Sequence, residues 1–416
     1  MQENTIPAQS IASLAINKAV LRSKPRSGAA LGIYGRTASA LAVSAANVEK
    51  RLRTRYALRD CSGTLMPKEA VARCGRHLAP SSGGVHVLYS PSAQTAHFGG
   101  LEACHSVWMC PCCAAKITER RRLELTIALR EARDLGLRVV MCTFTFRHHL
   151  GEHLPTMLKS MKRGWKLLMS GRRAQALRLA FGPVGFVKAL EVTYSDDNGW
   201  HPHMHVLFFL PAGTSSKAFG SALRTLWEEA AYSAGLSMDE HGFKIDDCNE
   251  KVAAYVAKFN RDPSEDTKKA WEQGWTEANE LTKWHTKLGR DEAGRPEHVT
   301  PMQLLQYAEG GDERAGRLFQ EYARAFKGQR QLFWSRGLKK LFGIDEKTDT
   351  EIAEEETADA ERLAFLYLEE WQVVLKRNKR VDLLMVARKG TMDLVADFLY
   401  GLGLERFAPG GAGRNG

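Results

Sequence analysis

The pattern of hydrophobic and polar positions divides the chain into helical and extended segments. Leucine and isoleucine recur at helical spacing in TERRRLELTIALREARDLG, and Gly136 stands where that helix would end. LRVVMCTFTF (137–146) and FVKALEVTY (186–194) are rich in β-branched and aromatic residues, which is typical of buried strands. HPHMHVLFFL (201–210) starts with alternating polar positions and ends in an apolar run, so we predict a third strand.

A tight turn is predicted between the second and third strands. SDDNGW separates them, and Asn198-Gly199 is the strongest hairpin signal in the chain. A loop and a helix are predicted at 147–171, between the first two strands, and further helices at 215–236 and 249–260. The middle of the chain therefore has the order β-α-β-β-α-α. We predict an α+β fold, with a central antiparallel β-sheet flanked by helices rather than a doubly wound parallel sheet.

Composition divides the chain into four regions. Residues 1–60 carry Ala, Ser, Gly and Arg with little periodicity, and we predict a flexible basic N-terminal arm. The cysteine-rich region 61–130 is expected to bind zinc. Residues 131–345 would form the sheet with a helical extension, and 346–416 would form acidic and amphipathic helices.

The net charge of the chain and its distribution indicate what kind of partner the protein binds. The formal net charge is +11, with Lys and Arg concentrated at 116–136 and 159–178, whereas 345–361 is acidic. This distribution favours a nucleic-acid partner. The candidates for phosphate contacts are Arg120, Arg121, Arg122, Lys162 and Arg163. The sequence has no apolar run of membrane-spanning length and no signal-peptide pattern, so we expect a cytoplasmic bacterial protein without a membrane partner.

The cysteines between positions 74 and 113 indicate a metal rather than disulfides. Cys110 and Cys113 are separated by two residues, a spacing that lets two thiolates wrap one ion. Cys74 and Cys104 are the natural second pair, and the alternative ligands are His105 and Cys112. Four protein ligands leave no open position, so we predict a structural zinc site.

Alternating histidines suggest a second metal site. His203 and His205 would project from the same strand face as His201. If the turn spans 195–199, Glu191 lies opposite His203; a shift of two residues places it opposite His205, and a shift of one turns it to the other face. Two imidazoles and one carboxylate can bind a divalent ion and leave positions open for a phosphate oxygen.

Pro202 separates His201 from the other two histidines. Proline cannot donate to a strand ladder, so we predict that the strand begins after Pro202 or lies at an edge there. His201 is then a neighbour of the metal site rather than a ligand.

Tyr255, in AAYVAKF, is the candidate nucleophile. On a helix, Lys258 would lie one turn further on, where its ammonium favours the phenolate and can hold a phosphate. The alternative is a packing role, because Tyr255 also belongs to an apolar stripe with Val252, Val256 and Phe259.

Together these motifs resemble those of the rolling-circle plasmid replication initiators, members of the HUH endonuclease superfamily. VMCTFTF (140–146) is similar to the first motif of that family, HPHMHVL (201–207) to its metal-binding motif and YVAK (255–258) to its tyrosine motif. CGR, CHSVWMCPCCAAKI and residues 311–340 are similar to further parts of one branch, so the resemblance covers about residues 60–345.

The resemblance implies a mechanism and partners. His203, His205 and Glu191 would hold Mg²⁺ or Mn²⁺ at the scissile phosphate of a plasmid double-strand origin. Tyr255 would attack that phosphate and keep a 5′-phosphotyrosine, while Lys258 stabilises charge on the phosphate. A host polymerase would extend the free 3′-OH and a host helicase would unwind the duplex.

The sequence departs from some relatives at Phe259, where they carry a second tyrosine. Termination would then use Tyr255 of a second subunit, as in a homodimer, or water activated by Glu250 or Glu280. Two rival functions are a relaxase or transposase of the HUH type and, from another class, a non-catalytic zinc-containing DNA-binding regulator. Relaxases usually place their tyrosine near the N-terminus, so the order of motifs favours an initiator.

Overall fold

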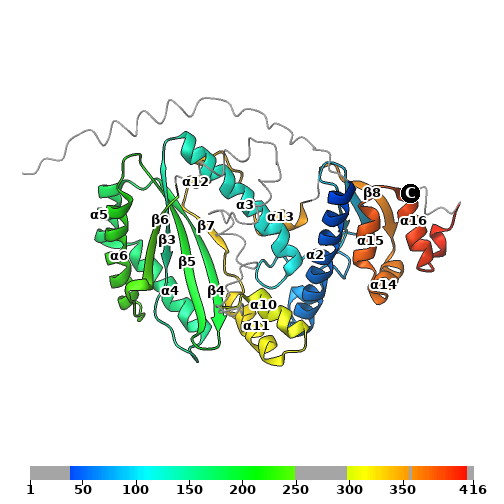
Figure 1. Cartoon of the computed structure of the whole chain (residues 1–416), viewed down its shortest axis with the longest axis horizontal. Helices are drawn as coiled ribbons and strands as arrows, with labels where there is room; N and C mark the ends of the chain where they lie inside the picture. The colour runs from blue at the N-terminus through cyan, green and yellow to red at the C-terminus, as the bar shows by residue number, and fades with distance from the viewer. Residues whose placement is uncertain (1–37, 249–297, 356–357, 410–416) are drawn as a thin grey trace, which may run out of the picture. The chain divides into compact units, whose positions relative to one another are not determined.

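The computed structural model describes residues 38–248, 298–355 and 358–409. This part of the chain forms two antiparallel sheets with helices packed against them (Figure 1). The larger sheet has the strand order β6-β3-β5-β4-β7, and the smaller one the order β2-β1-β8. Every pair of neighbouring strands is antiparallel, which confirms the predicted α+β class.

The larger sheet contains the three strands predicted from the hydrophobic pattern together with two short edge strands. Its members are β3 (Arg138–Phe144), β4 (Gly185–Ser195), β5 (Gly199–Leu210), β6 (Phe243–Asp247) and β7 (Leu332–Trp334). The smaller sheet is built from β1 (Val85–Ser90), β2 (Thr95–Gly99) and β8 (Glu361–Leu366).

The described helices of four residues or more lie before, between and after the strands. They are α2 (Ala38–Leu65), α3 (Pro111–Asp134), α4 (Leu154–Leu168), α5 (Gly171–Phe181), α6 (Ser216–Ser233), α10 (Pro301–Glu309), α11 (Glu313–Phe326), α12 (Leu338–Leu341), α13 (Asp349–Glu354), α14 (Leu368–Lys376), α15 (Arg380–Ala387) and α16 (Met392–Gly401). None of these helices is both long enough and apolar enough to cross a bilayer.

Side-chain alternation along the strands gives the larger sheet two apolar faces. On one face Val206 and Phe208 of β5 belong to a core that includes Trp165 of α4 and Trp227 of α6. On the other face Leu207 and its neighbours pack with apolar residues of α3 and α12. Figure 1 shows α4, α5 and α6 on one side of this sheet and α3 on the other. We call these the α4 face and the α3 face.

Helix α2 differs from the flexible arm expected through residue 60, because residues 38–60 are helical. Buried polar contacts hold the helix against the rest of the chain. Ser62 Oγ donates to the backbone oxygen of Met109 at 2.8 Å, and Asp60 forms an ion pair with Arg380. A helix that packs through an apolar stripe can be predicted from its hydrophobic periodicity, whereas these polar contacts leave no periodic pattern in the sequence.

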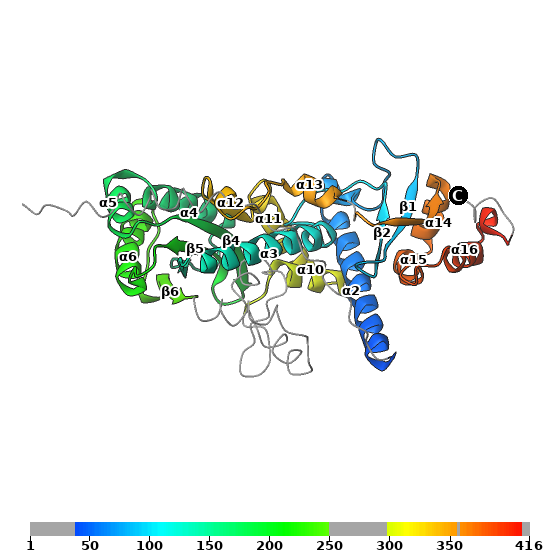
Figure 2. The same ribbon diagram turned by 90° about the horizontal axis from the view of Figure 1, so that it is seen from above.

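The region after residue 345 is mainly helical, as expected, and it also supplies β8. Val85 of β1 pairs with Leu366 of β8. The indole Nε1 of Trp371 in α14 donates to the backbone oxygen of Arg76 at 2.9 Å. Figure 2 shows α14, α15 and α16 beside β1 and β2. The C-terminal helices and the cysteine-rich region therefore share one small sheet and its core.

Candidate functional site

The β4–β5 hairpin has the register expected for a turn spanning 195–199. Ser195 pairs with Gly199, which places Glu191 directly opposite His203. Gly199 has a φ of 73°, and a Cβ at this position would lie 3.3 Å from the Cα of Leu150. The left-handed backbone conformation favours glycine here, and a Cβ would also crowd Leu150. The turn thereby fixes the register that brings the carboxylate to the histidines.

Glu191, His203 and His205 form a compact group of candidate metal ligands on the α3 face. Glu191 Oε2 lies 3.4 Å from Nε2 of His203 and 3.6 Å from Nε2 of His205. One ligand atom from each residue lies within 4.8 Å of the others, and Glu191 is only 3% exposed. A carboxylate at this depth needs compensating positive charge, which a divalent cation would provide. The group is compatible with metal binding.

The other ring nitrogens of these histidines are held away from the group. Nδ1 of His205 lies 3.0 Å from Oγ1 of Thr143, its partner across the β3–β5 ladder. Nδ1 of His203 lies 3.2 Å from the backbone oxygen of His201. Contacts of this kind fix the ring orientation of metal-binding histidines, and here they turn both Nε2 atoms towards Glu191.

His201 lies beside the group but outside it. Its Nε2 is 2.7 Å from Oγ1 of Thr145, and its ring stacks on that of His148 with a centroid separation of 4.6 Å. Burial and repulsion from neighbouring imidazoles, led by His203, lower the pKa of His201 to about 2, so its ring is neutral.

Pro202 lies at a strand edge, which is the second of the two positions expected for it. Strand β5 begins at Gly199, before the proline, so the expectation that the strand starts after it is wrong. The pairing of β3 with β5 ends at Met204, whereas β4 continues and pairs Val192 with Pro202. The proline therefore lies where β5 has a strand neighbour on one side only, so its missing N–H is tolerated.

Sequence reasoning did not single out the threonines that support the site. Thr143 and Thr145 lie at alternate positions and contact His205 and His201, respectively. The signal was present in TFTF, because residues two apart on a strand share a face. The pairing of β3 with β5 was needed to show that this face is the one with the histidines.

The four cysteines predicted to bind zinc lie together. Sγ of Cys74 is 3.6 Å from those of Cys110 and Cys113, and Sγ of Cys104 is 3.7 Å from that of Cys113. Sulfurs at about 2.3 Å from a tetrahedral zinc ion are about 3.8 Å apart, so the spacing fits a four-thiolate site.

The two alternative ligands lie outside this four-cysteine group. Nε2 of His105 is 2.9 Å from a carboxylate oxygen of Glu354. Cys112 follows Cys110 in the first turn of α3, where Sγ of Cys110 accepts from the backbone N–H of Cys113 at 3.5 Å.

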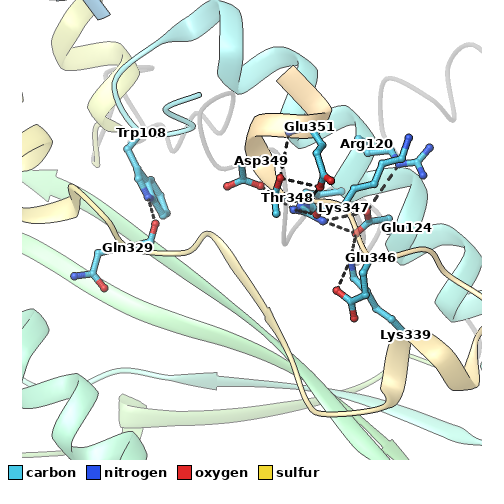
Figure 3. Close-up of polar contacts among 11 residues, drawn as sticks. Trp108, Arg120, Glu124, Gln329, Lys339, Glu346, Lys347, Thr348, Asp349 and Glu351 are labelled. Atoms are coloured by element: carbon cyan, nitrogen blue, oxygen red, sulfur yellow. Dashed lines mark hydrogen bonds and ion pairs between the residues drawn. The ribbon is translucent and has the colours of Figure 1, made fainter. Parts of the chain in front are cut away.

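The basic residues of α3 are engaged within the protein. Arg121 lies 3.0 Å from both carboxylate oxygens of Glu124 and 2.8 Å from Asp349 of α13. Lys339 of α12 also pairs with Glu124, at 3.1 Å, and Figure 3 shows Arg120 directed to the same carboxylate. Since Glu124 is 1% exposed, this is a buried network that ties α3 to α12 and α13.

The remaining candidates for phosphate contacts differ from one another. Arg122 pairs with Glu119 at 2.6 Å. Lys162 and Arg163 are exposed on α4, and neither forms an ion pair with a described carboxylate. The α4 cations are therefore more accessible to a ligand than those of α3.

Tyr255, Lys258, Glu250 and Glu280 lie outside the described residues. The described chain stops at Cys248 and resumes at His298, whose ring centroid lies 6.3 Å from that of His201.

Comparison with known proteins supplies the family. Residues 101–379, about two thirds of the chain, match the model of the replication protein family Rep_1. "Protein rep" of Streptomyces lividans is 26% identical over 333 residues, which cover 64% of this chain and 69% of that protein. "Neomycin resistance protein" of Streptomyces cyanogenus is 27% identical over 142 residues, covering 28% of this chain and 32% of that protein. No solved structure shows a significant match.

An antiparallel sheet that carries a Glu–His–His group, beside a four-cysteine cluster, is thus found in a chain that matches replication proteins. The chain belongs to the Rep_1 family of replication proteins and is a plasmid replication initiator of the Rep type.

Proposed function

We propose that this initiator is a site-specific single-strand DNA endonuclease and strand transferase of the HUH type, which nicks the plasmid double-strand origin through Tyr255. The observation that carries the proposal is the Glu191–His203–His205 group, whose ligand atoms lie within 4.8 Å of one another in a chain of this family.

The donor set fits a divalent ion, with Mg²⁺ or Mn²⁺ as the proposed identity. When bound by Glu191, His203 and His205, the ion would polarise the scissile phosphate and offset its charge. The protein's own contribution is to fix these ligands: the hairpin register places Glu191, and Thr143 orients His205.

Tyr255 would perform the covalent step. Its oxygen forms a bond to phosphorus as the bond from phosphorus to the 3′ oxygen breaks. The tyrosine loses its proton, the 3′ oxygen leaves as a hydroxyl, and the phosphate remains as a 5′-phosphotyrosine. One phosphodiester replaces another, so a later 3′-OH can reverse the exchange without ATP. Lys258 would favour the phenolate and stabilise charge on the phosphate.

The distance along the chain supports this role for Tyr255. The backbone N–H of Cys248 donates to Val139 O at 3.0 Å, four residues along β3 from Thr143, and four strand residues span about 13 Å. Tyr255 follows Cys248 by seven positions, which is about 10 Å along the helix predicted over 249–260. This distance is of the same order as the separation between Cys248 and the metal-ligand group.

The four-cysteine group is proposed to bind structural zinc. Cys74 follows α2, Cys104 follows β2, and Cys110 and Cys113 lie at the start of α3. One ion would fasten these three segments to one another, which suits a stabilising role and leaves no position for a substrate.

The proposed partners follow from the reaction. The initiator would bind origin DNA, provide a 3′-OH to a host polymerase and act with a host helicase. Termination would use Glu250, Glu280 or Tyr255 of a second subunit. The competing function is a zinc-containing DNA-binding regulator without catalysis; a relaxase or transposase of the HUH type would share the covalent step but not the origin.

The deciding experiment is detection of the covalent adduct. Single-stranded oligonucleotides that tile the origin are incubated with the protein and Mn²⁺, and a protein band that carries labelled DNA is expected on a denaturing gel. Tyr255→Phe should abolish the band and retain DNA binding. Tyr232→Phe, an exposed tyrosine on α6, is the matched control and should leave the band unchanged. An adduct that persists in Tyr255→Phe would refute the nucleophile, and no adduct with any oligonucleotide would favour the regulator.

A further inference from the structure

A stretch of the chain next to the candidate site carries cations and no carboxylate. Between Glu152 and Glu191 there are 38 residues without Asp or Glu and with eight Lys or Arg. The stretch therefore has a formal charge of +8, within a chain whose total is +11. It comprises α4, α5 and most of β4.

Four of these cations form a stripe on α4. We define the α4 stripe as Lys159, Lys162, Arg163 and Lys166, all of which are exposed. Their spacing of three, four and seven residues places them on one side of the helix. The opposite side is buried against the sheet and its neighbours through Leu158, Met161 and Trp165.

The stripe has no described carboxylate within ion-pair distance, unlike the arginines of α3. Arg121 and Arg122 are committed to Glu124, Asp349 and Glu119. None of the four stripe residues forms an ion pair in the described part of the chain. Acidic groups elsewhere thus satisfy the α3 cations and leave the α4 stripe available.

Lys188 of β4 lies close to the same group of positive charges and is affected by them. Its Nζ lies 4.8 Å from the centre of the Trp165 ring, on the α4 face of the sheet. Burial, and then repulsion from Lys162, lower the pKa of Lys188 to about 8. An anion seated on the stripe would relieve this repulsion.

We propose that the α4 stripe binds the phosphate backbone of duplex DNA at the origin. This inference rests on the proposed function only for the identity of the DNA. The stripe extends about 10 Å along the helix, which is about three base-pair steps of 3.4 Å. Contacts of this kind hold and orient a duplex without reading its sequence.

The exposed side chains of α4 and α5 favour a duplex over a single strand. Proteins that hold single strands usually stack bases on exposed aromatic rings. Both helices are fully described, and their two aromatic residues, Trp165 and Phe181, pack into the core rather than stand exposed. The α4 stripe therefore presents positive charge along a helix, without exposed aromatic rings on α4 or α5 on which bases could stack.

The location of the stripe would allow one face of the sheet to hold duplex DNA while the other carries the proposed cleavage site. The Glu191–His203–His205 group lies on the α3 face, whereas α4 lies on the opposite face. The loop between β3 and α4 passes the site, because His148 stacks on His201 just before α4 begins at Leu154. A duplex along α4 would thus run towards the end of the sheet where cleavage is proposed.

The test is the salt dependence of binding to a 30-base-pair duplex, measured by fluorescence anisotropy without added Mg²⁺ or Mn²⁺ so that no cleavage occurs. The triple variant Lys162→Gln, Arg163→Gln, Lys166→Gln is compared with wild type. Each phosphate contact contributes about 0.9 to the slope of log K against log salt, so three lost contacts should reduce the slope by about 2.7. At 0.1 M salt the affinity should fall by at least about ten-fold.

The matched control removes three other exposed cations, in Arg130→Gln, Arg133→Gln and Arg317→Gln. This control changes the net charge equally and should leave the slope near that of wild type. Equal slopes for both triple variants would overturn the proposal. An equal loss on a single-stranded oligonucleotide of the same length would overturn the assignment to duplex DNA. Failure of the covalent-adduct assay would refute the nuclease and leave these slopes unchanged.

Discussion

Glu191 and His203 face each other across the β4–β5 ladder, with the carboxylate oxygen Oε2 at 3.4 Å from the ring nitrogen Nε2. The pair depends on a turn whose register is set by Gly199, several residues away. The backbone conformation of the turn thus determines where the carboxylate of Glu191 lies in the sheet.

Replacing the carboxylate should remove metal binding without unfolding the protein. We expect Glu191→Gln to lose high-affinity Mn²⁺ binding, because the neutral amide no longer offsets the charge of the ion at a buried position. The decrease of the free Mn²⁺ signal in electron paramagnetic resonance measures the binding. Circular dichroism should show the fold intact, and Glu228→Gln on α6 serves as the control. Unchanged Mn²⁺ affinity in Glu191→Gln would rule out this ligand.

Thr143 should act as a positioning residue through His205. Loss of its hydroxyl in Thr143→Val removes the contact to Nδ1 at 3.0 Å, and such losses typically weaken metal binding by about 10–100-fold. The Mn²⁺ titration should show this weakening, and Thr143→Ser should restore most of the affinity. If valine and serine behave alike, the contact has no role in orienting the ligand.

Removal of zinc should affect stability rather than the nuclease site directly. We expect one zinc per chain, and Cys74→Ser should lose it and lower the melting temperature. Sγ of Cys74 lies 3.6 Å from those of Cys110 and Cys113, so its loss would detach the segment after α2 from α3. Zinc is measured by a colorimetric chelator after denaturation. Cys61→Ser, which changes a cysteine outside the group, should keep its zinc. By contrast, omission of Mg²⁺ and Mn²⁺ should stop cleavage without unfolding the protein.

The Glu124 network should make a large contribution to stability. Glu124→Gln would leave Arg121 and Lys339 without their shared buried counter-charge, which typically costs about 3–5 kcal/mol. Urea unfolding measures the loss. Glu119→Gln removes a carboxylate that is 49% exposed and should cost less than about 1 kcal/mol. Similar losses for the two variants would contradict a special role for burial.

The hairpin illustrates what the sequence was able to predict. Strands have a side-chain period of two, and Asn198-Gly199 marks a tight turn, so local rules predicted the hairpin and left three registers for Glu191. The structure has the register of a turn spanning 195–199, which pairs Glu191 with His203. The two-residue spacing of Cys110 and Cys113 was an equally local signal, and the structure brings the expected second pair, Cys74 and Cys104, into the same group.

Contacts between distant parts of the chain were beyond local rules. The pairing of β8 with β1 joins residues nearly 280 positions apart. The sequence pattern of β8 does not indicate which strand it pairs with. Arg121 looked like a phosphate ligand because its partner Asp349 is 228 positions away. Thr143 was overlooked for the same reason, since its role exists only once β3 lies beside β5.

The place of β1 between β2 and β8 has a consequence for deletion studies. A truncation before β8 would strip one neighbour from β1 and expose a row of unpaired backbone groups, together with the apolar residues that Trp371 covers. Loss of replication in such a truncation would therefore report a damaged cysteine-rich region, and it would reveal nothing about a separate task of the C-terminus. Point substitutions on the exposed surface of α16 are the better probe of that task.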